Sequence, residues 1–153
     1  MEQVYDEGGI IKADRKTEAE VVAALNKLSE GYTRRDMNGL LALLAPDPDV
    51  FIFGTGADER RVGLAEIRAQ FERDWSQSEA ASFQWGRHSV SAAGPVPWVA
   101  ADVTFKLKVA GEEITLPGRM TGVLEKRGDR WLIAQAHFSL PAGGQAEGES
   151  WPT

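Results

Sequence analysis

Apolar residues recur with a helical period in the first half of the chain. Thr17 and Glu20 have the spacing of a capping box, and the apolar positions that follow lie four, three and four residues apart. This pattern predicts a helix that opens at Thr17 and ends between residues 31 and 35. Asp36 is a suitable N-cap for a short second helix, which runs through four leucines and ends before Pro46.

A third helix is predicted from about Leu64 to Ser76. Its apolar residues lie three, four and four positions apart, which places them on one face of a helix. The opposite face is charged, so we expect solvent to cover it. The apolar face comprises Leu64, Ile67, Phe71 and Trp75, and the solvated face comprises Glu66, Arg68, Glu72, Arg73 and Asp74.

A period of two, typical of strands, replaces the helical period after residue 83. Short turns rich in Gly, Pro and Asp separate the alternating segments, which predicts an antiparallel meander. Helices followed by a meander indicate an α+β fold in which N-terminal helices cover a curved, mostly antiparallel sheet. The expected strands are residues 50–53, 83–91, 98–108, 114–126 and 130–140.

The last expected strand carries large apolar residues on both faces. Strict alternation would point Leu132 and Phe138 to one side, and Trp131 and Ile133 to the other. The helices would cover only one of these faces, and a large exposed apolar face is typical of an interface. A second copy of the chain is the simplest partner, so we predict a homodimer.

Composition places the chain among ordinary globular domains. It has 153 residues, of which 42% are hydrophobic and 26% charged, enough for one packed core. The formal net charge is −6 and adjacent basic residues occur only in isolated pairs, which argues against nucleic-acid binding. The sequence contains no cysteine, which excludes disulfides, thiolate nucleophiles and cysteine-based zinc sites.

The two ends of the chain lack a sustained pattern. Residues 1–16 are expected to form an arm and residues 142–153 a disordered tail, which leaves residues 17–141 as the domain. The acidic start lacks the basic and apolar regions of a signal peptide, and the apolar runs are too short to cross a membrane. We therefore expect a cytoplasmic protein with no membrane partner.

Near the C-terminus, the sequence resembles a known family. The segment 119–124, followed by Trp131–Ile133 and Ala136–Pro141, is similar to the closing hairpin of SnoaL-like domains. It is also similar to the end of the association domain of calcium/calmodulin-dependent kinases. Together with the order of helices and strands, these segments identify a resemblance to the SnoaL-like branch of the nuclear-transport-factor-2-like superfamily, which has a cystatin-like fold.

That resemblance implies a cone-shaped apolar cavity between the helices and the concave face of the sheet. Some members of the superfamily use this cavity for isomerisation, cyclisation or dehydration, and others only associate. Two hypotheses follow. The chain is a small-molecule-binding protein or enzyme that acts on an apolar, carbonyl-bearing or carboxylate-bearing ligand, or it is a non-catalytic association module.

The ketosteroid isomerases of this fold offer a residue-by-residue comparison. Their carboxylate base falls near Phe53, and their tyrosine falls near Leu28, one turn before Tyr32 on the same face. Their carboxylic acid on the sheet falls in the segment 119–121, which contains no acid. We therefore do not expect steroid-isomerase chemistry of that kind.

His137 and Arg119 are the predicted catalytic residues. A histidine titrates near neutral pH and is suited to proton transfer, and an arginine can stabilise a developing negative charge. We expect both to project from neighbouring strands into one cavity. On the alternative interpretation, His137 is a satisfied core or interface residue and Arg119 is paired across the strand.

Other polar and aromatic residues have weaker indications. Asp102 is expected at the surface, His88 has no distinctive context, and the segment Gly54–Gly56 lacks the remaining residues of a phosphate-binding loop. The spacing of the two histidines does not indicate a metal site, and no cofactor is predicted. The residues expected to line the cavity are Tyr32, Phe53, Phe71, Trp75 and Ser139.

Overall fold

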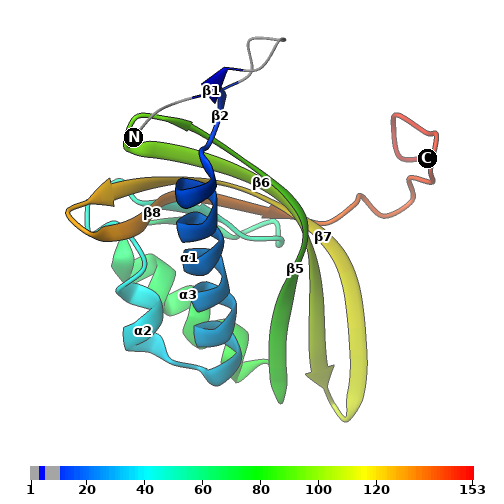
Figure 1. Ribbon diagram of the computed structural model, residues 1–153. Coiled ribbons are helices and arrows are strands. Elements are labelled where there is room, and N and C mark those ends of the chain that lie inside the picture. Colours follow the sequence, from blue (N-terminus) through cyan, green and yellow to red (C-terminus); the bar gives the residue numbers. More distant parts are fainter. Residues whose placement is uncertain (1–3, 6–10) are drawn as a thin grey trace.

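Helices cover one side of a curved sheet in the computed structural model, which describes residues 4–5 and 11–153 (Figure 1). The α+β order predicted from the sequence is confirmed. Within the described residues, the helices are α1 (Arg15–Arg34), α2 (Met37–Leu41) and α3 (Leu64–Ser76).

The main sheet has six strands in the order β4-β3-β8-β7-β6-β5 among the residues that the structure describes. Neighbouring strands are antiparallel except for β3 and β8, which run parallel. β1 and β2 form a separate two-stranded sheet in the N-terminal arm. The strands are β1 (Val4–Tyr5), β2 (Ile11–Lys12), β3 (Phe51–Phe53), β4 (Arg60–Val62), β5 (Ala80–Ala93), β6 (Val96–Val109), β7 (Glu112–Arg127) and β8 (Arg130–Ser139).

The N-terminus of α1 differs from the sequence prediction. The helix begins at Arg15, and its N-cap is Asp14, whose carboxylate accepts a hydrogen bond from the Thr17 backbone N–H at 2.7 Å. Thr17 is therefore the third residue of the helix, and its side chain is buried. The arm is also tied to the sheet, because the backbone N–H of Ala13 donates to the carbonyl of Val90 at 3.2 Å.

The second helix is shorter than expected. Asp36 caps α2 as predicted, by accepting a hydrogen bond from the Gly39 N–H at 3.0 Å, but the helix ends at Leu41. Leu44 instead forms a parallel bridge with Ile133 of β8. The segment after α2 is thereby held against β8 before β3 begins.

The last strand does not alternate strictly, contrary to the sequence prediction. The register between β7 and β8 shifts between Val123 and Leu124, where the partners change from Gln135 to Ile133. A bulge of this kind inserts one residue and reverses the facing of those beyond it. Ile133 therefore faces the helices together with Ala136 and does not lie on the opposite side.

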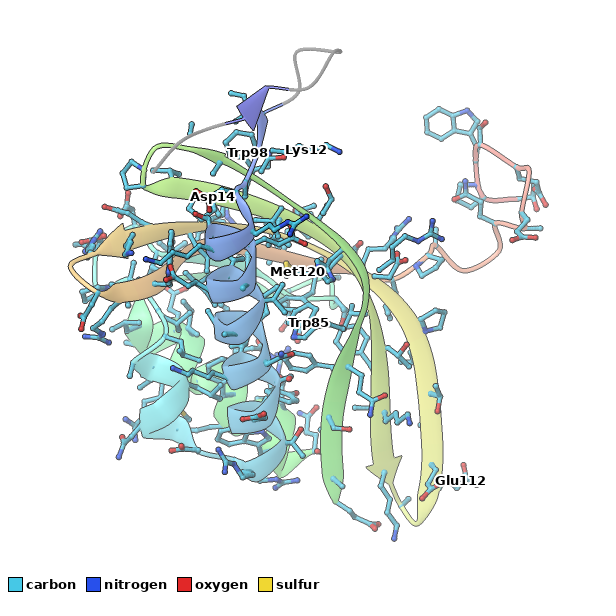
Figure 2. The ribbon with its side chains drawn as sticks, in the orientation of Figure 1. Lys12, Asp14, Trp85, Trp98, Glu112 and Met120 are labelled. Carbon is cyan, nitrogen blue, oxygen red and sulfur yellow. The ribbon has the colours of Figure 1, made fainter. Side chains whose placement is uncertain are left out.

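The sheet has a packed inner face and a solvated outer face. Trp85 and Met120 lie on the inner side, toward α1, and the indole N–H of Trp85 donates to the carbonyl of Leu25 at 2.8 Å (Figure 2). The outer face is the side opposite the helices. Its residues alternate with buried neighbours and include Phe53, Trp98, Ala100, Asp102, Arg119, Thr121, Gln135 and His137.

Candidate functional site

A pocket of about 380 Å³ lies between the helices and the inner face of the sheet. We call it the inner pocket. Its volume falls in the range of known small-molecule sites, about 300–1,000 Å³. Its wall is mostly apolar, and it is built from aromatic and aliphatic side chains of α1, α3 and the long strands. The principal apolar residues are Leu28, Ile52, Phe71, Phe83, Phe105, Leu116, Ile133 and Phe138.

The aromatic part of the wall is a connected cluster. Phe83 is at its centre, with ring centroids 5.2 Å from Tyr32, 6.2 Å from Phe105 and 6.0 Å from Phe138. Tyr32 also meets Phe71 edge to face at 6.1 Å. Such offset and edge-to-face contacts hold aromatic side chains in fixed positions. The wall is thereby formed before any ligand enters.

One end of the inner pocket is polar. The hydroxyl of Tyr32 donates to Oδ2 of Asp74 at 2.9 Å. The amide nitrogen of Gln70 donates to Oδ1 of Asp74 at 2.6 Å and to Oε1 of Glu59 at 2.7 Å. All four residues line the pocket. Two carboxylates are thus joined through one amide group.

Helical spacing explains why these side chains meet. Gln70 and Asp74 lie four residues apart on α3, and Phe71 lies beside them, so all three share one side of the helix. Tyr32 is one turn beyond Leu28 on α1, on the side that faces the sheet. Glu59 comes from the turn between β3 and β4, and the backbone N–H of Gly56 donates to it.

Burial changes the proton affinity of this polar end. It raises the pKa of the Asp74 carboxyl above its ordinary value, and the charge of Glu59 acts in the same direction. Hydrogen bonds from Gln70 and Tyr32 oppose this shift. Burial, and next the charge of Asp74, raises the pKa of the Tyr32 phenol, so the hydroxyl remains a proton donor.

Two arginines support the polar end from outside the pocket. Nε of Arg61 donates to Oε1 of Gln70 at 2.9 Å, which fixes the orientation of the amide. The Arg73 guanidinium donates to both oxygens of Asp58, at 2.7 and 3.2 Å, and lies 3.4 Å from Oε1 of Glu59. Neither arginine is among the residues that line the pocket. No lysine, arginine or histidine of the described residues lines it.

His137 and Arg119 share a face of the sheet, but it is the outer face. His137 of β8 pairs with Thr121 of β7. Its ring lies 5.0 Å, centroid to centroid, from the ring of Phe53. Arg119 pairs with Asp102 and Ser139 and is exposed. The inner pocket includes neither predicted catalytic residue. The expectation of a cavity shared by both is corrected, because the alternation of β7 and β8 turns them away from the helices.

The residues predicted to line the cavity divide into two groups. Tyr32 and Phe71 line the inner pocket, whereas Phe53, Trp75 and Ser139 do not. Trp75 stacks on Phe71 at 5.9 Å and supports it from behind. Phe53 alternates with Ile52, and it is Ile52 that faces the pocket.

Asp74, Gln70 and Glu59 were missed in the sequence analysis, which assigned Asp74 to the solvated face of the third helix. That assignment is wrong, because the carboxylate turns toward Tyr32 and the residue is half-buried. The spacing of Gln70 and Asp74, four residues apart beside Phe71, was the available signal. Asp102 is exposed, as predicted.

The structure gives no indication of a metal centre in the residues it describes. No group of three or more carboxylate or imidazole side chains is arranged there to hold a metal ion. His88 instead lies 3.7 Å from the carboxylate of Glu18 on α1.

Helices that cover one side of a curved, mostly antiparallel sheet are the fold that the resemblance to SnoaL-like domains implied. A family model described as a SnoaL-like domain matches residues 21–143. The chain therefore belongs to the SnoaL-like domain family, and the resemblance read from its last hairpin is confirmed. None of the curated proteins matches the chain.

Solved structures show the same fold at low sequence identity. A nuclear-transport-factor-2-like superfamily protein from Salmonella enterica is 16% identical, with a TM-score of 0.78 over 91% of this chain and 100% of that one. A candidate dehydratase from Streptomyces avermitilis is 17% identical, with a TM-score of 0.76 over 84% and 99%. A candidate calcium/calmodulin-dependent kinase II association domain from Xanthomonas campestris is 24% identical, with a TM-score of 0.72 over 81% and 87%.

Within residues 4–5 and 11–153, no helix has the length and apolar character that spanning a membrane requires.

Proposed function

We propose that this protein binds a small, apolar, carbonyl-bearing molecule in the inner pocket and catalyses a proton transfer on it. Isomerisation, cyclisation and dehydration all include such a step. The observation that carries this proposal is Asp74, a carboxylate of raised pKa at the polar end of a mostly apolar pocket. A carboxyl group whose pKa is shifted and which lies in a cleft is a candidate general acid or base.

The arrangement at the polar end supports specific roles for two residues. Asp74, when ionised, removes a proton from the carbon next to the ligand carbonyl. The electron pair of that C–H bond forms a carbon–carbon double bond, and the π pair of the carbonyl group moves to its oxygen. Once Asp74 is protonated, it no longer needs the hydrogen bond from Tyr32. The Tyr32 hydroxyl can then donate to the enolate oxygen.

The second half of the reaction returns the proton. If Asp74 gives it back to a different carbon, the product is an isomer. If the ligand carries a hydroxyl group on the second carbon from the carbonyl, Asp74 protonates that oxygen as its C–O bond breaks. The products are then an unsaturated carbonyl compound and water. The candidate dehydratase of the same fold is consistent with this second outcome.

Hydrogen–deuterium exchange tests this proposal. The protein is incubated in D2O with a panel of neutral and amine-bearing aryl ketones, and exchange at the carbon next to the carbonyl is followed by NMR. We expect exchange above the buffer rate for at least one ketone, and we expect Asp74→Asn to lose it. Glu72→Gln is the matched control, because it removes a negative charge from the exposed side of α3 and should exchange like the wild type.

Thermal shift measurements on the same panel separate binding from chemistry, because a ligand that binds the folded state raises the Tm. The catalytic proposal is wrong if no ketone exchanges above the buffer rate, and binding is refuted as well if no ketone raises the Tm. The catalytic proposal is also wrong if exchange occurs at the same rate with Asp74→Asn.

A second candidate function, self-association, is favoured by the outer face of the sheet. Trp98 and Phe53 are exposed there by 41% and 36%. Phe53 begins a cross-strand row that continues through His137, Thr121 and Ala100, and Trp98 lies two residues from Ala100 on β6. We propose that this face packs against a second copy of the chain. The residues that support this dimer differ from those in the sequence prediction, because Ile133 lies on the inner face.

Light scattering at micromolar concentration tests the dimer. We expect twice the chain mass of 16.7 kDa for the wild type, and the monomer mass for Trp98→Arg. Trp151→Arg is the control, since Trp151 is 81% exposed in the C-terminal segment, away from the sheet. A wild-type mass of 16.7 kDa would overturn this proposal.

A further inference from the structure

We propose that the ligand of the inner pocket is a hydrophobic molecule that carries a protonated amine, and that its ammonium group lies at the polar end between Asp74 and Glu59. This inference rests on the proposed function, because it specifies the class of ligand that the same pocket takes. It also opposes the carboxylate-bearing ligand that the sequence analysis allowed.

Charge is the first argument. The charged side chains that line the pocket are both carboxylates, and within the described residues no cation lines it. The nearby arginines are engaged elsewhere: Arg61 with Gln70, Arg73 chiefly with Asp58, and Arg35 with the backbone carbonyls of residues 75 and 78. A carboxylate ligand would be desolvated beside two negative groups with no partner.

Hydrogen-bonding capacity is the second argument. The two amide hydrogens of Gln70 are used on Glu59 and Asp74, and the hydroxyl hydrogen of Tyr32 is used on Asp74. The hydroxyl of Ser78 donates to a backbone carbonyl at 2.9 Å. Each carboxylate oxygen can accept more bonds than it receives here. The polar end therefore has spare acceptors, and an ammonium group supplies three donors.

The aromatic wall is the third argument. Tyr32, which donates to Asp74, has ring contacts with Phe71 and Phe83, and the faces of aromatic rings attract cations. Phe105 and Phe138 join this cluster through Phe83, and with Leu116 they belong to the apolar part of the lining. A compact cation or a polyamine would leave that part of the pocket unfilled. The wall thus fits a molecule with one cationic end and an apolar body.

The amine also removes a difficulty in the proposed chemistry. An enolate formed next to Asp74 and Glu59 would be repelled by the carboxylate of Glu59, which does not take up the proton. A positive charge on the ligand itself offsets that repulsion, since opposite charges within about 4–6 Å favour the charged form of a group. An amine near the carbonyl would therefore stabilise the enolate, and it would also favour the ionised form of Asp74 that accepts the proton.

Three naphthalene probes of matched size test the inference on the wild-type protein. They are 1-naphthylmethylamine, 1-naphthalenemethanol and 1-naphthoic acid, and their affinities are measured by calorimetry at neutral pH. We expect the amine to bind about tenfold or more tightly than the alcohol, and the acid to bind most weakly. Equal or tighter binding of the alcohol or the acid would overturn the inference.

Variants then locate the ammonium group. Asp74→Asn and Glu59→Gln should each reduce the preference for the amine over the alcohol several-fold, while Glu72→Gln should leave it unchanged. An amine preference that survives both substitutions would overturn the assigned position. Circular dichroism melting shows which variants fold, and the comparison of probes on the wild type does not depend on them.

The two proposals fail in different ways. If an amine-bearing ketone exchanges hydrogen but the amine probe has no advantage, the inference is wrong and the proposed function stands. If the amine probe binds best but no ketone exchanges, the pocket is a binding site of the inferred specificity and the catalytic proposal is wrong. If no probe and no ketone binds, both are wrong.

Discussion

Replacing Gly118 with alanine should destabilise the folded protein by about 1–3 kcal/mol, the usual cost of overpacking a well-packed core. A Cβ atom at this position in β7 would lie 2.5 Å from Cε2 of Phe105 and 3.0 Å from the carbonyl oxygen of Ser139. Phe105 cannot simply move aside, because its ring is held 6.2 Å from both Phe83 and Phe138. The ring and the neighbouring strand must both shift.

Thermal denaturation measures this effect. For a domain of this size we expect the Tm to fall by about 2–12 °C. Gly122 lies on the same strand, and its added Cβ would meet its nearest atoms at 3.3 Å, so Gly122→Ala should cost less. A Cβ atom added at Gly143 would have no atom within 4 Å apart from those of its chain neighbours, so Gly143→Ala should leave the Tm unchanged. An unchanged Tm for Gly118→Ala would show that Phe105 is not held in the wall.

The helices and long strands could be predicted because their signals are local. The residues of α3 alternate with a period that only a helix satisfies, and the predicted bounds agree with Leu64–Ser76. The strand β6 was predicted from its period of two, and its residues alternate between buried and exposed from Pro97 to Val103. In both elements, packing agrees with the local pattern, so a single sequence is enough.

The errors arose where tertiary contacts override a local pattern. The bulge opposite Val123 shifts Ile133 to the inner face, and alternation alone gives no sign of it. β4 has only three residues, two of them arginines, and it exists because β3 provides a partner. A strand so short and polar has no amphipathic pattern to detect.

The candidate site was missed for a related reason. Asp74 is a charged residue on a helix, and such residues are usually exposed, so a solvated position was the better prediction. It is half-buried because its carboxylate turns inward, where Tyr32 and Gln70 donate to it. Both donors lie on surfaces that meet only after α1 and α3 pack on the sheet. The sequence contains the residues of the site, but only the fold brings them together.

Asp74→Asn should make the protein more stable at neutral pH, although it removes the proposed function. Burial raises the pKa of Asp74 in the folded state, so the folded protein binds this proton more tightly than the unfolded chain does. Above the raised pKa the ionised carboxylate therefore destabilises the fold. An asparagine carries no charge, keeps one acceptor, and can donate to the oxygen of Tyr32.

The Tm difference between Asp74→Asn and the wild type should depend on pH. The Tm of Asp74→Asn should exceed that of the wild type at pH 8, and the excess should shrink as the pH falls through the raised pKa of Asp74. It should vanish below about 3.9, the pKa of an aspartate in an unfolded chain, because Asp74 is then protonated in both states. Thermal denaturation at several pH values measures the difference.

Asp58→Asn provides a control of opposite sign. The hydrogen bond from Arg73 lowers the pKa of Asp58, so its ionised form stabilises the folded state above the unfolded pKa, and that contribution is lost as the pH falls through the lowered value. This variant should therefore be less stable than the wild type at pH 8, by a small amount because Asp58 is exposed. If Asp74→Asn also lost stability at pH 8, the Asp74 carboxylate would be stabilised by its surroundings. Its pKa would then not be raised by burial, and the proposed acid–base role would lose its physical basis.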